Sequence, residues 1–282
     1  MRKILISIIS LILPLVASAQ AQINTKKVKI SDFTQKVTKV VLNGNQFFDI
    51  TFQEEITARW RISPYEFCTL EEFEKLKTND NYYFLMTTYG QFRKETAPGL
   101  QFLTLVKGGK EAENSIGDML EIVSLPFASA EYPSGRELVF LPAFLDIIQN
   151  HTMAAMEKDI NGYAGLASNN LTLGKTDDLE VIISMDDLST EVTDEQKAGL
   201  EARNILLTDE DDADRYMTDR VPGTMVSYVA VPSEPVIGSY CYKMLIDAQT
   251  HKLYYFKRHR ISKKAGAGFL PDDIDRIKAS RR

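Results

Sequence analysis

The sequence predicts an α+β protein built from two tandem, similar αβ units, each a mixed sheet with covering helices. The motif F-L-P-x-x-L-D-x-I at residues 140–148 recurs as F-L-P-x-x-I-D-x-I at residues 269–277. A proline after an apolar segment is typical of a first helical turn, so each copy predicts a helix at the end of one unit. The chain has 282 residues and 44% hydrophobic residues, enough for two domains with real cores.

The first unit begins with a strand and an amphipathic helix. Phe48, Phe52, Ile56 and Trp60 recur every four residues and place one apolar stripe on a helix. Thr69 and Glu72 have the spacing of a capping box and predict the start of a second helix. The expected strands are 36–42, 65–68, 82–88, 101–106 and 119–127, and a helix opened by Pro142 ends the unit.

The second unit repeats this order. Thr193 with Gln196, and Thr208 with Asp211, predict two helix starts between apolar strands. The expected strands are 181–183, 205–207, 225–231, 240–246 and 253–261, and Pro271 opens the final helix. Three strands in a row without a helix must pair as antiparallel neighbours, so each sheet is expected to be mixed.

The first residues predict export. Arg2 and Lys3 precede an apolar stretch that is too short to span a bilayer, and Ala17-Ser18-Ala19 is an A-x-A cleavage signal. We expect a signal peptide at residues 1–19, cleaved after Ala19, and a periplasmic or extracellular mature chain with no transmembrane segment. The predicted domains are residues 20–160 and 179–282, joined by a Gly-, Asn- and Ser-rich linker at 161–178.

Cys68 and Cys241 are the two cysteines. In an oxidising compartment they could form one disulfide, or they could be two small buried hydrophobic residues. Cys68 as a nucleophile is a weaker hypothesis, because no histidine lies near it in the sequence.

Charge is distributed unevenly along the chain. Loss of Arg2 and Lys3 with the signal peptide leaves a net charge of −8; residues 252–282 hold ten basic and three acidic residues, or +7, so the rest carries −15. The basic residues that gather at the end of the last predicted strand are Lys257, Arg258, Arg260, Lys263 and Lys264.

This basic group could bind an anionic partner, such as an envelope protein or an anionic surface. On a strand, Lys257 and His259 would face one way and Arg258 and Arg260 the other. The alternative is that the acidic run at 209–214 neutralises it within the chain or across a dimer. Nucleic acid is not expected, since the protein is acidic and has no recognisable nucleic-acid-binding motif.

The sequence contains no recognisable catalytic or metal-binding constellation, and we assign it no cofactor. His251 and His259, if on one strand, lie some 26 Å apart at about 3.3 Å per residue, too far for one metal. The acidic run lacks the glycine and glutamate of a calcium loop, and its place at a helix start fits the helix dipole instead. The aromatic strands at 82–84 and 254–256 are expected in the core or between the units.

The hairpin at residues 243–253 has a strand ending in Asp247, a turn carrying Thr250 and a second strand of alternating apolar residues. It resembles the αβ modules of TolB amino-terminal domains and CsgG-like envelope proteins, over roughly the second half of the chain, although His251 stands where those families often carry glycine. In general make-up the chain also resembles secreted proteins of Bacteroidota. These resemblances imply an envelope location and a binding or assembly role, and no active site.

The sequence therefore favours a secreted, non-enzymatic binding or assembly module of the envelope. One alternative is an enzyme, such as a hydrolase, with an unrecognised site in a groove between two pseudo-symmetric units. Another is a peripheral membrane protein held by its basic C-terminal region.

Overall fold

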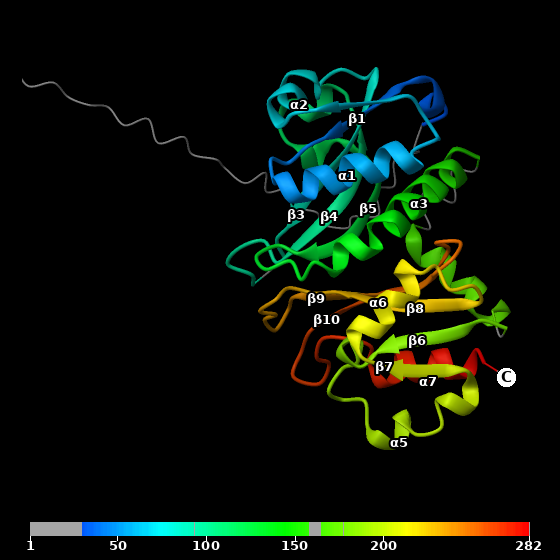
Figure 1. The fold of residues 1–282 in the computed structure, drawn as a ribbon. Helices are drawn as coiled ribbons and strands as arrows, with labels where there is room; N and C mark the ends of the chain where they lie inside the picture. The colour runs from blue at the N-terminus through cyan, green and yellow to red at the C-terminus, as the bar shows by residue number, and fades with distance from the viewer. Residues whose placement is uncertain (1–29, 93, 158–164, 177, 282) are drawn as a thin grey trace, which may run out of the picture.

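Two five-stranded mixed sheets with helices form the protein (Figure 1). The computed structural model describes residues 30–92, 94–157, 165–176 and 178–281. The predicted signal peptide and the first residues of the predicted linker lie outside the described residues. The predicted fold class is confirmed: both sheets are mixed and both carry helices.

The first unit follows the expected order. Its short 3-10 turns are η1 (Phe33–Gln35), η2 (Lys110–Glu113) and η3 (Ile116–Asp118). Its helices and strands are β1 (Val37–Val41), α1 (Gln46–Arg59), β2 (Tyr65–Cys68), α2 (Leu70–Leu76), β3 (Tyr82–Gly90), β4 (Leu100–Lys107), β5 (Leu120–Ser129) and α3 (Arg136–Glu157).

The second unit has the same succession of strands. Its 3-10 segments are η4 (Leu166–Lys175), η5 (Met185–Asp187) and η6 (Glu201–Arg203). Its helices and strands are β6 (Glu180–Ser184), α5 (Asp194–Lys197), β7 (Ile205–Thr208), α6 (Glu210–Thr218), β8 (Thr224–Ala230), β9 (Tyr240–Asp247), β10 (Leu253–Arg260) and α7 (Pro271–Ala279).

The two sheets share one topology. Their strand orders are β2-β1-β3-β4-β5 and, read in the corresponding direction, β7-β6-β8-β9-β10. In each sheet the first strand pairs in parallel with the next two strands of the chain, and the last three strands pair antiparallel. The absence of a helix between those last strands produces the antiparallel half, as predicted.

The helix starts confirm most of the capping predictions. Thr69 with Glu72 and Thr193 with Gln196 both form reciprocal capping boxes. The predicted start at Thr208 is wrong by one residue, because the side chain of Asp209 accepts the hydrogen bond from Asp212 N and makes Asp209 the N-cap.

The proline motif plays two different roles. Pro271 opens α7, as predicted, but the prediction that Pro142 opens a helix is wrong, because α3 begins at Arg136 and Pro142 lies inside it. The segment between β5 and Arg136 turns at Gly135, which has a φ of +92°, so the chain enters the helix earlier than the proline alone suggests.

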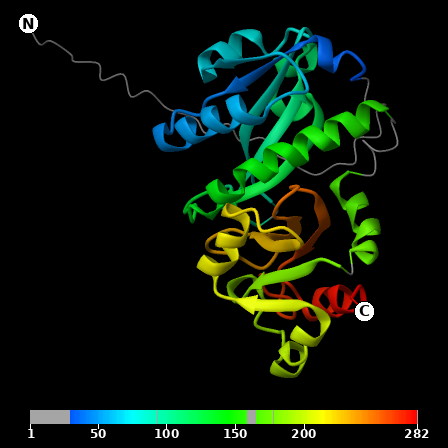
Figure 2. The same ribbon diagram turned by 45° about the vertical axis from the view of Figure 1, so that its right-hand side comes forward.

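The units meet through non-equivalent faces. The face of the first sheet covered by α1 and α3 shares one core with the face of the second sheet covered by α6. The equivalents of α1 and α3 in the second unit, α5 and α7, lie on the opposite face of its sheet, over a separate core. Figures 1 and 2 show α3 running along the boundary between the two sheets.

Aromatic side chains fill this boundary. Tyr228 of β8 contacts the rings of Phe140 and Phe144 in α3, with centroids 4.6 and 5.1 Å apart, and Phe102 contacts Tyr242 at 5.8 Å. The two units therefore share a continuous packed core at this boundary, where the enzyme alternative would need a groove between pseudo-symmetric halves.

Candidate functional site

The alternation predicted for β10 is confirmed and divides its basic residues between two faces. Lys257 turns inward, where its Nζ lies 2.6 Å from Oδ1 of Asp273. Arg258 and Arg260 lie on the other face, beside Tyr240 of β9. One of the five predicted anion-binding residues is thus already paired within the chain.

Asp273 is the centre of a buried cluster beneath β10. Its Oδ2 accepts from Lys243 Nζ and from Leu270 N, and its Oδ1 accepts from Tyr255 Oη at 2.7 Å and from Lys257. Burial opposes ionisation, but the hydrogen bonds from the two lysines outweigh it and lower the pKa of Asp273 to about 2. Burial lowers the pKa of Lys243. The cluster is satisfied internally, and we assign it to anchoring α7 on the sheet.

Arg258 and Arg260 are exposed but held in place. Both guanidinium groups lie 5.1 Å from the ring centroid of Tyr240, and Arg260 Nε donates to Tyr240 Oη at 2.9 Å. The Tyr240 ring packs in turn against Phe92 of the first unit, with centroids 4.7 Å apart. A cation above a tyrosine face is stabilised by the ring quadrupole, so these side chains are oriented without a carboxylate.

Lys263 and Lys264 follow on a compact turn. Ser262 N donates to Ala265 O at 2.8 Å, and Lys264 N donates to Ser262 Oγ at 3.3 Å. Both lysines are exposed. We call Arg258, Arg260, Lys263 and Lys264 the cationic strip; no acidic side chain in the described part of the chain forms an ion pair with any of its four members.

The acidic run at 209–214 does not neutralise the cationic strip within the chain, so that expectation is wrong. The run lies at the N-terminus of α6, as predicted from the helix dipole. Its carboxylates pair instead with Arg136 and with Arg215, whose Nη1 lies 2.8 Å from Asp212 Oδ1.

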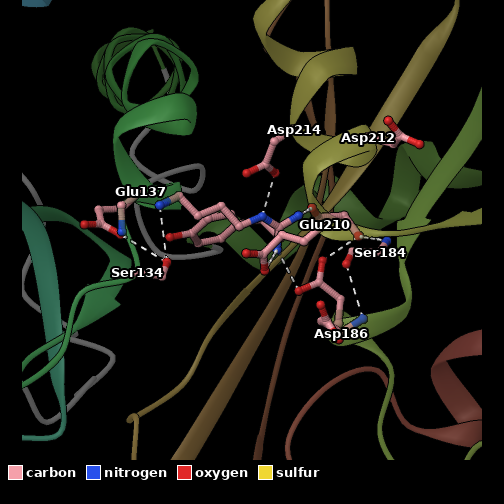
Figure 3. A network of polar contacts seen from close by, with 12 residues as sticks. Ser134, Glu137, Ser184, Asp186, Glu210, Asp212 and Asp214 are labelled. Atoms are coloured by element: carbon pink, nitrogen blue, oxygen red, sulfur yellow. Dashed lines mark hydrogen bonds and ion pairs between the residues drawn. The ribbon is translucent and has the colours of Figure 1, made fainter.

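Arg136 is a buried cation that the sequence reasoning missed. Figure 3 shows this polar network, in which Glu210 and Asp214 are labelled. Arg136 is 6% exposed, and its Nε lies 2.7 Å from Asp214 Oδ1 and its Nη1 2.8 Å from Asp187 Oδ1. Its Nη2 donates to Ser227 O at 2.9 Å, and Glu210 Oε2 is 3.8 Å from Nη1. Arg136 begins α3 in the first unit, and its partners belong to the second, so this ionic centre joins the two units.

Burial and opposite charge compete within this centre. Burial raises the pKa of Asp214 and of Glu210, and Arg136 opposes that effect on both. Burial disfavours the charged guanidinium, yet Asp187 and Asp214 raise the pKa of Arg136. The acidic half of this centre was visible in the sequence as the adjacent Asp186 and Asp187 and as the acidic run at 209–214. Only the tertiary fold brings an arginine from α3 between these two groups of carboxylates.

The same boundary contains a second polar contact. His251 Nδ1 lies 2.6 Å from Oδ2 of Asp146 in α3, and Arg59 Nη1 is 3.4 Å from that oxygen. His251 has a φ of +58°, in the left-handed region that favours glycine. In the residues that the structure describes, no three His, Cys, Asp or Glu side chains form a group that could hold a metal.

Cys68 and Cys241 are free thiols, and the disulfide considered from the sequence is replaced by two separate buried side chains. Cys68 ends β2 in the first sheet and Cys241 lies on β9 in the second, so the two thiols belong to different sheets. Burial raises the pKa of each thiol to about 11, which disfavours a nucleophilic thiolate.

A hollow beside Trp60 is bounded by Thr34, Arg61, Ser63 and Met153 among others. The guanidinium of Arg61 donates there to the carbonyl oxygens that end α1, and Trp60 Nε1 donates to Ser63 Oγ at 3.0 Å. These polar groups serve the end of the helix, and we assign the hollow no chemistry.

Searches of protein-family models, of curated proteins and of solved structures returned no match to this chain. None of the helices in the described ranges is long and apolar enough to cross a bilayer.

Proposed function

We propose that the protein is a binding module that holds an anionic partner on the cationic strip. One observation carries the proposal: the buried cations Arg136 and Lys243 are matched by carboxylates, whereas the four exposed cations of the strip have no such match in the described chain. Positive surface charge without neighbouring carboxylates attracts and orients an anionic surface.

The same contrast favours binding over catalysis. The clusters of titrating groups lie inside the core, where Asp273 and Arg136 are enclosed by their own partners, and a catalytic group needs access to substrate. With the leader-like sequence at residues 1–19, we place the proposed binding role in the cell envelope.

The proposal is tested by in-cell crosslinking of the tagged protein, followed by mass spectrometry of what is captured. The test variant replaces all four residues of the cationic strip with glutamate. A control variant makes the same total charge change at exposed cations elsewhere, namely Lys75, Lys110, Arg215 and Arg276. A partner that is lost in the test variant and retained in the control supports the proposal, and a partner retained in both refutes it.

Membrane-surface binding is a second candidate, favoured by the loop before β9. Val236 and Ile237 are 44% and 50% exposed, and Gly238 N donates to Ile261 O at 2.9 Å, beside the strip. Exposed aliphatic residues next to cations are typical of contact with anionic lipid. For this candidate we expect the protein to be recovered in the membrane fraction. The recovered amount should decrease when salt is added and should also be lower for a Val236→Ser, Ile237→Ser variant.

A further inference from the structure

The cationic strip begins on an edge strand. β10 pairs with β9 and is the last strand of its sheet. Successive residues of a strand direct their backbone N–H and C=O groups to alternate sides, so every second residue of β10 presents both groups away from β9.

Phe256 identifies which residues point outward. Its N–H donates to Asn170 Oδ1 at 2.7 Å, and its C=O accepts from Asn170 Nδ2 at 2.8 Å. The Asn170 amide thus occupies the position that the backbone of a further strand would take. Counting by two, Arg258 and Arg260 also direct their backbone groups outward.

Arg258 and Arg260 therefore combine two recognition features. Their backbone groups face the open edge, where the described chain supplies no partner, and their side chains are oriented on the Tyr240 ring and exposed. Beyond Arg260, Ile261 N continues the pairing by donating to Ser239 O at 2.8 Å, and the next outward N–H, that of Ser262, is occupied because it donates to Ala265 O at 2.8 Å. The open edge is thus short and bounded at both ends.

We propose that an extended acidic segment of a partner protein adds to the second sheet as a strand alongside Arg258 and Arg260. This inference rests on the proposed function and specifies its partner. The backbone of the segment would pair with the outward groups of both arginines, and carboxylates at alternate positions would meet the guanidinium groups on one face.

Charge decides which strand fits this edge. A second copy of β10 would place arginine opposite arginine, which is unfavourable, and charged side chains on an edge deter uncharged strands as well. An acidic strand meets opposite charge at both positions. The edge that charge protects from self-association is therefore selective for an acidic occupant.

The test uses the purified full chain and a fluorescein-labelled hexapeptide of alternating threonine and glutamate, measured by fluorescence anisotropy at low salt. A second peptide of the same sequence carries N-methyl groups on all of its internal backbone amides, which preserves its charge but removes the N–H donors from both edges of the strand. Two protein variants are matched: Arg258→Gln removes the charge, and Arg258→Pro also removes an N–H that points away from β9, a substitution that edge strands tolerate.

We expect the native protein to bind the unmethylated peptide and to bind the methylated peptide at least about tenfold more weakly. The unmethylated peptide should bind the proline variant about two- to tenfold more weakly than the glutamine variant, which is the range for the loss of one hydrogen bond. Far-ultraviolet circular dichroism checks that both variants are folded. If the proline variant does not fold, the two peptides on the native protein still decide the question.

Equal affinity for the two peptides would overturn strand addition and leave charge-based binding, and with it the proposed function, intact. Binding of neither peptide, with a crosslinked partner still lost on charge reversal of the strip, would also overturn this inference alone. Binding to phosphatidylglycerol vesicles without binding to the peptide would assign the strip to a membrane surface instead.

Discussion

Replacing Arg136 with methionine tests whether the buried ionic centre holds the two units together. Methionine retains an unbranched aliphatic stem like that of arginine, but it lacks the guanidinium group that pairs with Asp187 at 2.8 Å and with Asp214 at 2.7 Å. It also leaves the carbonyl of Ser227 without its donor. Removing one member of a buried ion pair leaves an uncompensated charge and costs about 3–5 kcal/mol, so we expect a loss of that size in the free energy of unfolding at pH 7.

The matched control is Arg215→Met. Arg215 also pairs with an aspartate, at 2.8 Å, but its side chain is 70% exposed. Exposed ion pairs contribute about 0–1 kcal/mol, so the control should change stability by no more than that. Urea unfolding, followed by circular dichroism and by the fluorescence of the single tryptophan, Trp60, measures both variants.

The loss in Arg136→Met should become smaller as the pH falls. Burial already raises the pKa of Asp214 and of Glu210, and without Arg136 their folded-state pKa values rise further. A carboxyl group whose pKa is raised on folding binds a proton more readily in the folded state, so lowering the pH favours folding. A stability loss equal to that of the control, or one that does not change between pH 7 and pH 4, would refute the role assigned to Arg136.

Three further predictions concern other buried groups. Asp273→Asn should destabilise the protein more than Asp275→Asn in urea unfolding, since Asp275 is exposed. The stability that Asp273 contributes should be present above about pH 4 and lost as the pH falls through its folded pKa of about 2. The difference in stability between the two variants should therefore become smaller in acid. Cys68 and Cys241 should both react slowly with a thiol reagent in the folded protein and rapidly once the protein is unfolded. A fast reaction in the native protein would contradict their burial. His251→Gly should destabilise by about 1–2 kcal/mol through the lost contact with α3, and His251→Ala by up to about 1 kcal/mol more because of its positive φ; thermal melts in which alanine is the milder change would contradict this reasoning.

Local sequence patterns predicted most of the individual elements. The four-residue spacing of Phe48, Phe52 and Ile56 predicted α1, and these side chains are buried in the core. Thr69 with Glu72 predicted the capping box of α2, because the interaction involves residues only three apart. The start of α3 was predicted wrongly from Pro142. Proline is favoured in the first turn of a helix, but its presence does not show that the residues before it are outside the helix.

The candidate site was predicted only in part. The alternation of a strand correctly divided Lys257 from Arg258 and Arg260, since side-chain direction has period two. The sequence could not show that Lys257 pairs with Asp273, or that Tyr240 orients the two arginines, because these contacts join residues from different elements.

The sequence by itself determined the αβ composition, the repeated order of strands and the concentration of positive charge near the C-terminus. These properties depend on residue type and short-range spacing, which are the same in any conformation of the chain. Only the tertiary structure decided that the units meet through non-equivalent faces, that Arg136 pairs with acids of α6, and that no carboxylate of the described residues forms an ion pair with the cationic strip. Ion pairing and burial depend on distances between residues far apart in the chain, and those distances exist only after the two sheets have packed.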